Sequence, residues 1–146
     1  MFGKMLEKLS GGFSRLSGRT DLLEGIAAAA ALVAAADGDI EDEEVVAVLA
    51  ALENHPVLSK SFKSSEIERI ADTMLKRAKA GAAGRLGLMR EIEEAKARSS
   101  VEDLEMLLVI AIDVSNSDGE MEPQEKVVLG KIAKTLNLNL STYLDL

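Results

Sequence analysis

The chain has no cysteine and no tryptophan, one histidine, two prolines and only 3% aromatic residues. Without cysteine it can form no disulfide, no thiolate metal site and no thiol redox centre. A single histidine also excludes a centre built from several imidazoles, so carboxylates are the side chains left for chemistry. The residues that are abundant, alanine, leucine, glutamate and lysine, favour helices, and runs of β-branched residues are few. The composition therefore predicts an all-α fold.

Long hydrophobic runs are also missing. The longest uninterrupted apolar stretch covers residues 26–36 and consists mostly of alanine, whereas about 20 apolar residues are needed to span a bilayer. Charges at Lys4, Glu7 and Lys8 interrupt the apolar residues near the N-terminus, so no secretory signal core is recognisable. We expect a cytoplasmic protein.

Acidic residues outnumber basic ones by 25 to 17, which gives a net charge of −8 and argues against nucleic acid as a partner. Residues 1–20, by contrast, have a net positive charge, with four basic side chains and one acidic one. The same segment has an apolar stripe at helical spacing, formed by Phe2, Met5, Leu6, Leu9, Phe13 and Leu16.

This pattern is typical of a helix that lies on a membrane surface. The alternative is that the stripe packs on the acidic body of the protein. We predict a basic amphipathic segment at residues 1–19, which makes a weak peripheral contact with a membrane or a partner, followed by a helical domain at residues 20–146. Glycine at position 18 marks the joint between them.

Apolar residues at helical spacing and helix start and stop signals predict six helices. They cover about 22–36, 42–53, 66–80, 83–98, 101–116 and 123–136, and residues 137–146 add a terminal turn. Short turns at 37–41 and 118–122 predict two antiparallel hairpins that pack together. We therefore expect a compact domain of six or seven helices built from two pseudo-repeated helical hairpins with acidic turns.

Two local signals refine these helices. Ser65 and Glu68 have the spacing of a capping box for the third helix. Gly84 and Gly87 weaken the start of the fourth helix, because glycine is a poor helix former.

The two acidic turns form an internal repeat. With a shift of 81 residues, Ala-Asp-Gly-Asp-Ile-Glu at 36–41 aligns with Ser-Asp-Gly-Glu-Met-Glu at 117–122, and Glu44 aligns with Glu125. Residues 37–44 include six acids, residues 118–125 include four, and neither stretch has a base. Such crowding of like charge is unfavourable unless something offsets it.

Helix capping is one explanation for these acids. Pro123 at the first helical position makes Glu122 the N-cap and Glu125 the N3 residue of a capping box. By the repeat, Glu41 and Glu44 take the same roles in the earlier helix. Acids in a first turn also interact favourably with the helix dipole. Capping leaves the aspartate that opens each turn unexplained.

Binding of a hard cation is the second explanation. With the glycine of each turn at position 6 of a calcium loop, each turn supplies carboxylates at positions 5 and 12 and a backbone carbonyl at position 7. The residues are Asp37, Asp39 and Glu44 in the first turn and Asp118, Glu120 and Glu125 in the second. Positions 1 and 3 lack carboxylates, so neither turn is an EF-hand, and water or the opposite turn must complete the coordination. Asp113 is a candidate accessory acid.

Docking of a basic partner is the third explanation, and catalysis is not expected. The sequence shows no nucleophile, base or phosphate-binding loop, and His55 before Pro56 is interpreted as a surface or capping residue. We expect a metal-dependent regulatory or scaffolding module. The alternative is a metal-independent interaction adaptor whose acidic turns bind a basic partner.

Two blocks of the sequence resemble the TerB family of tellurite-resistance proteins. Residues 33–44 contain Ala-Asp-Gly followed by Glu-Glu, and residues 115–136 contain Ser-Asp-Gly, Glu-Lys and Lys-Ile-Ala-Lys-Thr-Leu. The likeness extends over residues 20–144. It implies an all-helical cytoplasmic protein, at the inner face of the membrane, that acts in the stress response to tellurite and related envelope or phage stress.

The resemblance also implies ligands and partners. It places a divalent metal ion, such as calcium, in the acidic turns, with the metal positions carried over to Asp37, Asp39, Glu44, Asp118, Glu120 and Glu125. The implied partners are a TerC-like membrane protein and TerD-like calcium proteins. The first turn is more acidic than the second, so two sites need not be equivalent.

Overall fold

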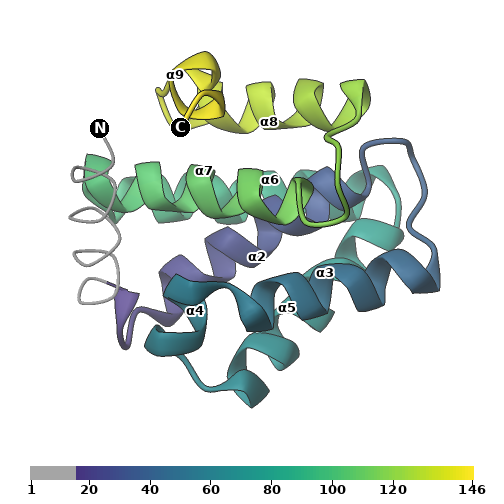
Figure 1. Cartoon of the computed structure of the whole chain (residues 1–146), viewed down its shortest axis with the longest axis horizontal. Coiled ribbons are helices and arrows are strands. Elements are labelled where there is room, and N and C mark those ends of the chain that lie inside the picture. Colours follow the sequence, from purple (N-terminus) through teal and green to yellow (C-terminus); the bar gives the residue numbers. More distant parts are fainter. Residues whose placement is uncertain (1–15) are drawn as a thin grey trace.

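The computed structural model describes residues 16–146. This range contains helices and no strand, which confirms the predicted all-α fold (Figure 1). The helices are α2 (Thr20–Ala34), α3 (Asp42–Asn54), α4 (Pro56–Ser61), α5 (Ser64–Lys79), α6 (Ala82–Ala97), α7 (Val101–Ser115), α8 (Pro123–Thr135) and α9 (Leu140–Leu144). No helix in this range is both long enough and apolar enough to cross a bilayer.

Helix α2 is the central element. It packs most extensively on α5, α6 and α7, and also contacts α3 and α8. Its residues from position 25 to 33 are all buried, and most are alanine, so neighbouring helices can approach its backbone closely. At Gly25 an added Cβ would lie 2.9 Å from Ala95 Cβ and 3.2 Å from Leu107 Cδ1. Small residues on α2 therefore determine how closely the neighbouring helices pack against it.

The six predicted helices all form, and their ends differ from the prediction by no more than about two residues, the usual uncertainty of a helix end. The short helix α4 was not predicted. Pro56 ends α3 but also serves as the first residue of α4, a position that proline favours. The predicted capping box at Ser65 and Glu68 is wrong, because α5 begins at Ser64 with Lys63 as its N-cap, which places Ser65 inside the first turn.

Helices α5 and α6 are joined by a tight connection. Gly81 has φ +92°, a backbone conformation that favours glycine. A Cβ at Gly84 would lie 1.8 Å from the carbonyl oxygen of Arg77, and one at Gly87 would lie 2.7 Å from the Arg77 guanidinium. Arg77 Nη1 also pairs with Glu91 Oε1 at 3.0 Å. The two glycines thus permit α6 to lie against the end of α5.

The acidic turns connect α2 to α3 and α7 to α8. Buried side chains from all four of these helices belong to one hydrophobic core, so the turns lie in the same domain. Helix α3 packs mainly on α5, whereas α8 packs mainly on α2 and α7. A pseudo-repeat of the two complete hairpins stays a prediction.

Candidate functional site

The two acidic turns share a backbone conformation. Gly38 has φ +96° and Gly119 has φ +122°. The Gly38 N–H donates to the Ala35 carbonyl (2.9 Å), and the Gly119 N–H donates to the Asn116 carbonyl (3.1 Å). Because left-handed backbone favours glycine, this conformation explains why Asp-Gly recurs in both turns.

Both turns end in a capping box. The Glu41 N–H donates to Glu44 Oε1 (3.3 Å), and the Glu122 N–H donates to Glu125 Oε1 (2.8 Å). In return, the side chain of each N-cap glutamate accepts from the backbone of the N3 residue. The predicted capping roles are confirmed at both helix starts.

One cavity of about 220 Å³ lies between the two turns. Its apolar wall includes Val33 of α2 and Val48 of α3, and its polar lining includes Glu44, Asp118 and Glu125. Two glutamates that stand 81 residues apart in the sequence therefore line the same cavity. The fold brings together half of the predicted metal positions.

Electrostatics in this cavity disfavour two ionised glutamates. Burial raises the pKa of Glu44, and neighbouring acids of its own turn, Asp37 first, raise that pKa further. Burial likewise raises the pKa of Glu125, with added contributions from Asp118, Glu122 and Glu44. The capping hydrogen bonds oppose these effects. A bound proton or a bound cation would relieve the repulsion.

The remaining predicted metal positions lie outside the cavity lining. Asp37 Oδ1 accepts from the Asp39 N–H at 3.1 Å, so this carboxylate folds back on its own turn. Asp39 and Glu120 are exposed to solvent. Within residues 16–146, no group of three or more histidine or carboxylate side chains is arranged to hold a metal ion. The candidate ligands are near one another but are not drawn into a common coordination sphere.

His55 is buried, at 7% exposure, between α3 and α4. Its Nδ1 accepts from the Val57 N–H (3.2 Å) and so caps α4, while its Nε2 lies 2.7 Å from Asp113 Oδ2 of α7. The bond to Nδ1 assigns the proton to Nε2, which donates to Asp113. The predicted capping role is confirmed, but His55 is not a surface residue. Asp113 binds this histidine, a role that the sequence did not indicate.

Leu16 is the one member of the predicted N-terminal apolar face that falls in the described range. Its side chain is fully buried and belongs to the hydrophobic core. Nearby, Arg19 pairs with Asp21 (2.9 Å) and with Asp103 of α7 (3.6 Å), which ties the start of α2 to the start of α7. The other members lie outside the described residues: Phe2, Met5, Leu6, Leu9 and Phe13.

A comparison with protein families agrees with this fold. The model of the family described as tellurite resistance protein TerB matches residues 23–145. The match includes both acidic turns and helices α3 to α9. Searches of curated proteins and of solved structures found no match. The chain belongs to the TerB family of tellurite resistance proteins.

Proposed function

We propose that this chain is a non-enzymatic tellurite-stress module whose acidic turns together bind a hard divalent cation such as calcium. One observation carries the proposal: Glu44 and Glu125, from opposite turns, line one cavity, where burial raises the pKa of Glu125 and the charge of Glu44 adds to this effect. A cation between the turns would offset this repulsion. It would thereby stabilise α3 and α8 in their present relative positions.

The donor set fits a hard cation, because calcium and magnesium prefer oxygen ligands. Glu44, Asp118 and Glu125 would hold the ion from the cavity. Asp37, Asp39 and Glu120 would contribute from the rest of the turns. Capping does not preclude ligation, because Oε1 of each N3 glutamate makes the capping bond and Oε2 accepts no hydrogen bond from residues 16–146.

A structural role suits this cavity better than a catalytic one. The two serines that line it are engaged in their own helix end: Ser115 Oγ donates to the Ala111 carbonyl (2.9 Å) and Ser117 Oγ donates to the Val114 carbonyl (2.7 Å). Among residues 16–146, neither hydroxyl has a base as its partner that could activate it as a nucleophile. The chemistry that the bound ion would supply is positive charge and a link between two helix starts.

We propose further that the loaded module regulates or scaffolds a membrane-associated complex at the cytoplasmic face. A TerC-like membrane protein and TerD-like calcium proteins are the partners that its family suggests. Four acids of the turns are exposed, so a partner could bind them through their negative charge: Asp37, Asp39, Asp118 and Glu120. This exposure also supports the alternative function, an adaptor whose acidic turns bind a basic partner without any metal.

Thermal unfolding of the chelator-treated full chain distinguishes these two functions. A cation that binds the native state raises the melting temperature in proportion to occupancy. We expect calcium, magnesium or manganese at millimolar concentration to raise it, and Glu44→Gln and Glu125→Gln each to reduce the rise. Glu68→Gln, at an exposed acid on α5, is the matched control and should leave the rise unchanged. If none of the three cations changes the melting temperature, the adaptor function is favoured.

A further inference from the structure

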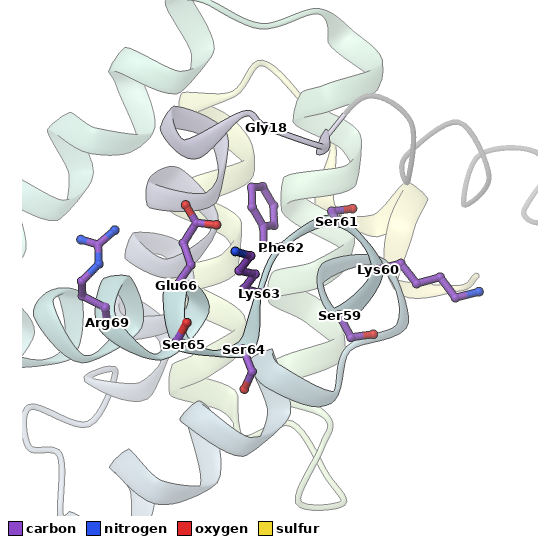
Figure 2. Close-up of a pocket in the computed structure, with 10 residues that line it drawn as sticks. All are labelled: Gly18, Ser59, Lys60, Ser61, Phe62, Lys63, Ser64, Ser65, Glu66 and Arg69. Carbon is purple, nitrogen blue, oxygen red and sulfur yellow. The ribbon is translucent and has the colours of Figure 1, made fainter.

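A second hollow lies where α4 leads into α5, beside the residues that precede α2 (Figure 2). It is a broad groove of about 950 Å³. Gly18 forms one side, residues 59–62 of α4 and its C-terminal end form another, and the first turns of α5 form the floor. None of the acidic-turn residues contributes to its lining.

The groove and the acidic turns lie at opposite ends of two helices. Gly18 precedes α2 and Asp37 follows it, so about 22 Å of helix separates them. Helix α5 runs in the same direction, because Ser64 begins it at the groove and Lys79 at its other end approaches Asp42 (3.4 Å), the first residue of α3 directly after the first acidic turn. This separation exceeds the Debye length of about 8 Å at physiological salt, so the acidic turns do not neutralise the groove.

The groove is basic in a chain whose net charge is −8. Lys60, Lys63 and Arg69 line it, against one acid, Glu66. Within the described part of the chain, Lys63 and Arg69 form no ion pair. Glu66 is directed toward α2, where its Oε2 accepts from Thr20 Oγ1 at 3.5 Å. The groove lining therefore carries more positive than negative charge, and Glu24 of α2 is a further acid close enough to interact with Arg69.

Hydrogen-bond donors accompany this charge. The hydroxyls of Ser59 and Ser61 donate to carbonyls of α4, whereas Ser64 and Ser65 line the groove at the start of α5. Lys63, the N-cap of α5, makes no side-chain capping bond. Ammonium, guanidinium and hydroxyl groups together recognise oxyanions, phosphate above all. The partial positive charge of a helix start acts in the same direction.

We propose that this groove binds phosphate groups, carried either by a soluble anion or by a lipid headgroup. Lys63 lies in the middle of the groove, with Lys60 and Arg69 at opposite sides (Figure 2). This spread suits a ligand with more than one anionic group. The proposal goes beyond the cation site and does not depend on it, because the two sites have opposite charge and lie at opposite ends of α2.

The first arm of the test is a titration of the full chain with inorganic phosphate, followed by amide chemical shifts at ionic strength held constant with chloride. We expect saturable shifts confined to residues 59–69. Lys63→Gln and Arg69→Gln should each weaken binding about threefold, the effect of losing one exposed charge contact. Lys131→Gln removes the same charge from an exposed site on α8 and should not change binding.

The second arm tests the lipid source by co-sedimentation with phosphatidylglycerol vesicles, with phosphatidylcholine vesicles as the neutral comparison. Residues 1–19 are present in every sample, so the informative quantity is the difference between the wild type and the Lys63→Gln/Arg69→Gln double variant. Reduced pelleting of the double variant identifies headgroups as ligands, and shifts with free phosphate identify a soluble anion.

Lys63 and Arg69 are both exposed, so the double variant should fold. Its thermal unfolding curve checks this. The proposal is overturned if phosphate causes no saturable shifts at residues 59–69 and the folded double variant pellets with phosphatidylglycerol as much as the wild type does.

Discussion

Glu44 and Glu125 each combine a capping bond with an unfavourable electrostatic position. Glutamine keeps the capping hydrogen bond and removes the charge. We therefore expect Glu125→Gln to stabilise the metal-free protein at neutral pH by about 0.3 kcal/mol for each like-charge contact removed. Urea unfolding after chelator treatment measures this. A large loss of stability instead would show that the carboxylate has a favourable partner in the native state.

The same residues give a pH dependence. Their pKa values in the folded protein are raised above the ordinary 4.5, so the native state holds protons more tightly than the unfolded chain does. Their contribution to stability is therefore fully present below pH 4.5 and is lost as pH rises through the raised values. We expect the stability gain from the Glu44→Gln/Glu125→Gln pair to be larger at pH 7 than at pH 4. The pKa of Asp21 is lowered by Arg19, so Asp21 gives stability the opposite dependence on pH. This contribution is the same in the wild type and in the double variant, and it therefore cancels when their stabilities are subtracted.

The His55–Asp113 contact predicts the behaviour of a second pair of variants. Asp113→Ala leaves the N–H of a buried imidazole without its acceptor, which we expect to lower the free energy of unfolding by about 1–2 kcal/mol. Asp113→Asn retains a carbonyl oxygen and should recover most of this loss. Chemical denaturation of both variants provides the comparison. A free energy of unfolding of Asp113→Ala equal to that of the wild type would mean that the contact adds nothing to the fold.

At the scale of helices, the contact of α6 with the end of α5 depends on glycine. Gly84→Ala would place a methyl group 1.8 Å from the Arg77 carbonyl oxygen, so the helices must separate, at a cost of about 2–3 kcal/mol. Gly130 of α8 is the matched control, because an added Cβ would meet one atom, Leu140 Cδ2, at 4.0 Å. Gly130→Ala should stabilise the protein by up to about 1 kcal/mol through helix propensity. Similar melting temperatures for the two variants would contradict this account of α6.

The sequence predicts those helices that carry a clear period and their own caps. The turns are predictable in detail, because Asp-Gly and a glutamate at N3 are local signals. Helix α4 was missed because Pro56 signals the end of one helix and the start of another equally well. Helix propensity predicts that Gly84 only weakens the start of α6. The structure shows that glycine is needed there, because the carbonyl of Arg77 on the neighbouring helix leaves no room for a side chain.

The site shows the same division between local and long-range information. The acidic residues can be found from the sequence, but the cavity that joins Glu44 to Glu125 arises from packing of α2, α3 and α7. The basic groove has a weaker local signal in the sequence: Lys60 and Lys63 stand among serines 59, 61, 64 and 65, while Arg69 follows only after Glu66 and Glu68. Its position opposite the acidic turns depends on the parallel course of α2 and α5.

At the scale of the whole molecule, α2 separates two ends of opposite charge. The acidic turns lie at one end and the junction of α4 with α5, which forms the basic groove, lies at the other (Figure 1). The buried alanines of α2 hold the surrounding helices together. A module with this arrangement can bind a cation at one end and an anion at the other without mutual neutralisation. We expect salt to weaken anion binding at the groove more than cation binding in the partly buried cavity, because exposed charges are screened more strongly. Titrations of phosphate and calcium at two salt concentrations compare the two.

The central claim is that the two turns act together on one kind of ligand, a hard cation. Isothermal calorimetry of calcium with the chelator-treated full chain, the two single Glu→Gln variants and the double variant at 44 and 125 tests it most directly. The account predicts saturable binding by the wild type, weaker binding by each single variant and none by the double variant. At a calcium concentration ten times Kd, the bound ion should add about 1.4 kcal/mol to the stability of the wild type. Absence of binding heat at millimolar calcium, or equal binding by the wild type and the double variant, would contradict the claim.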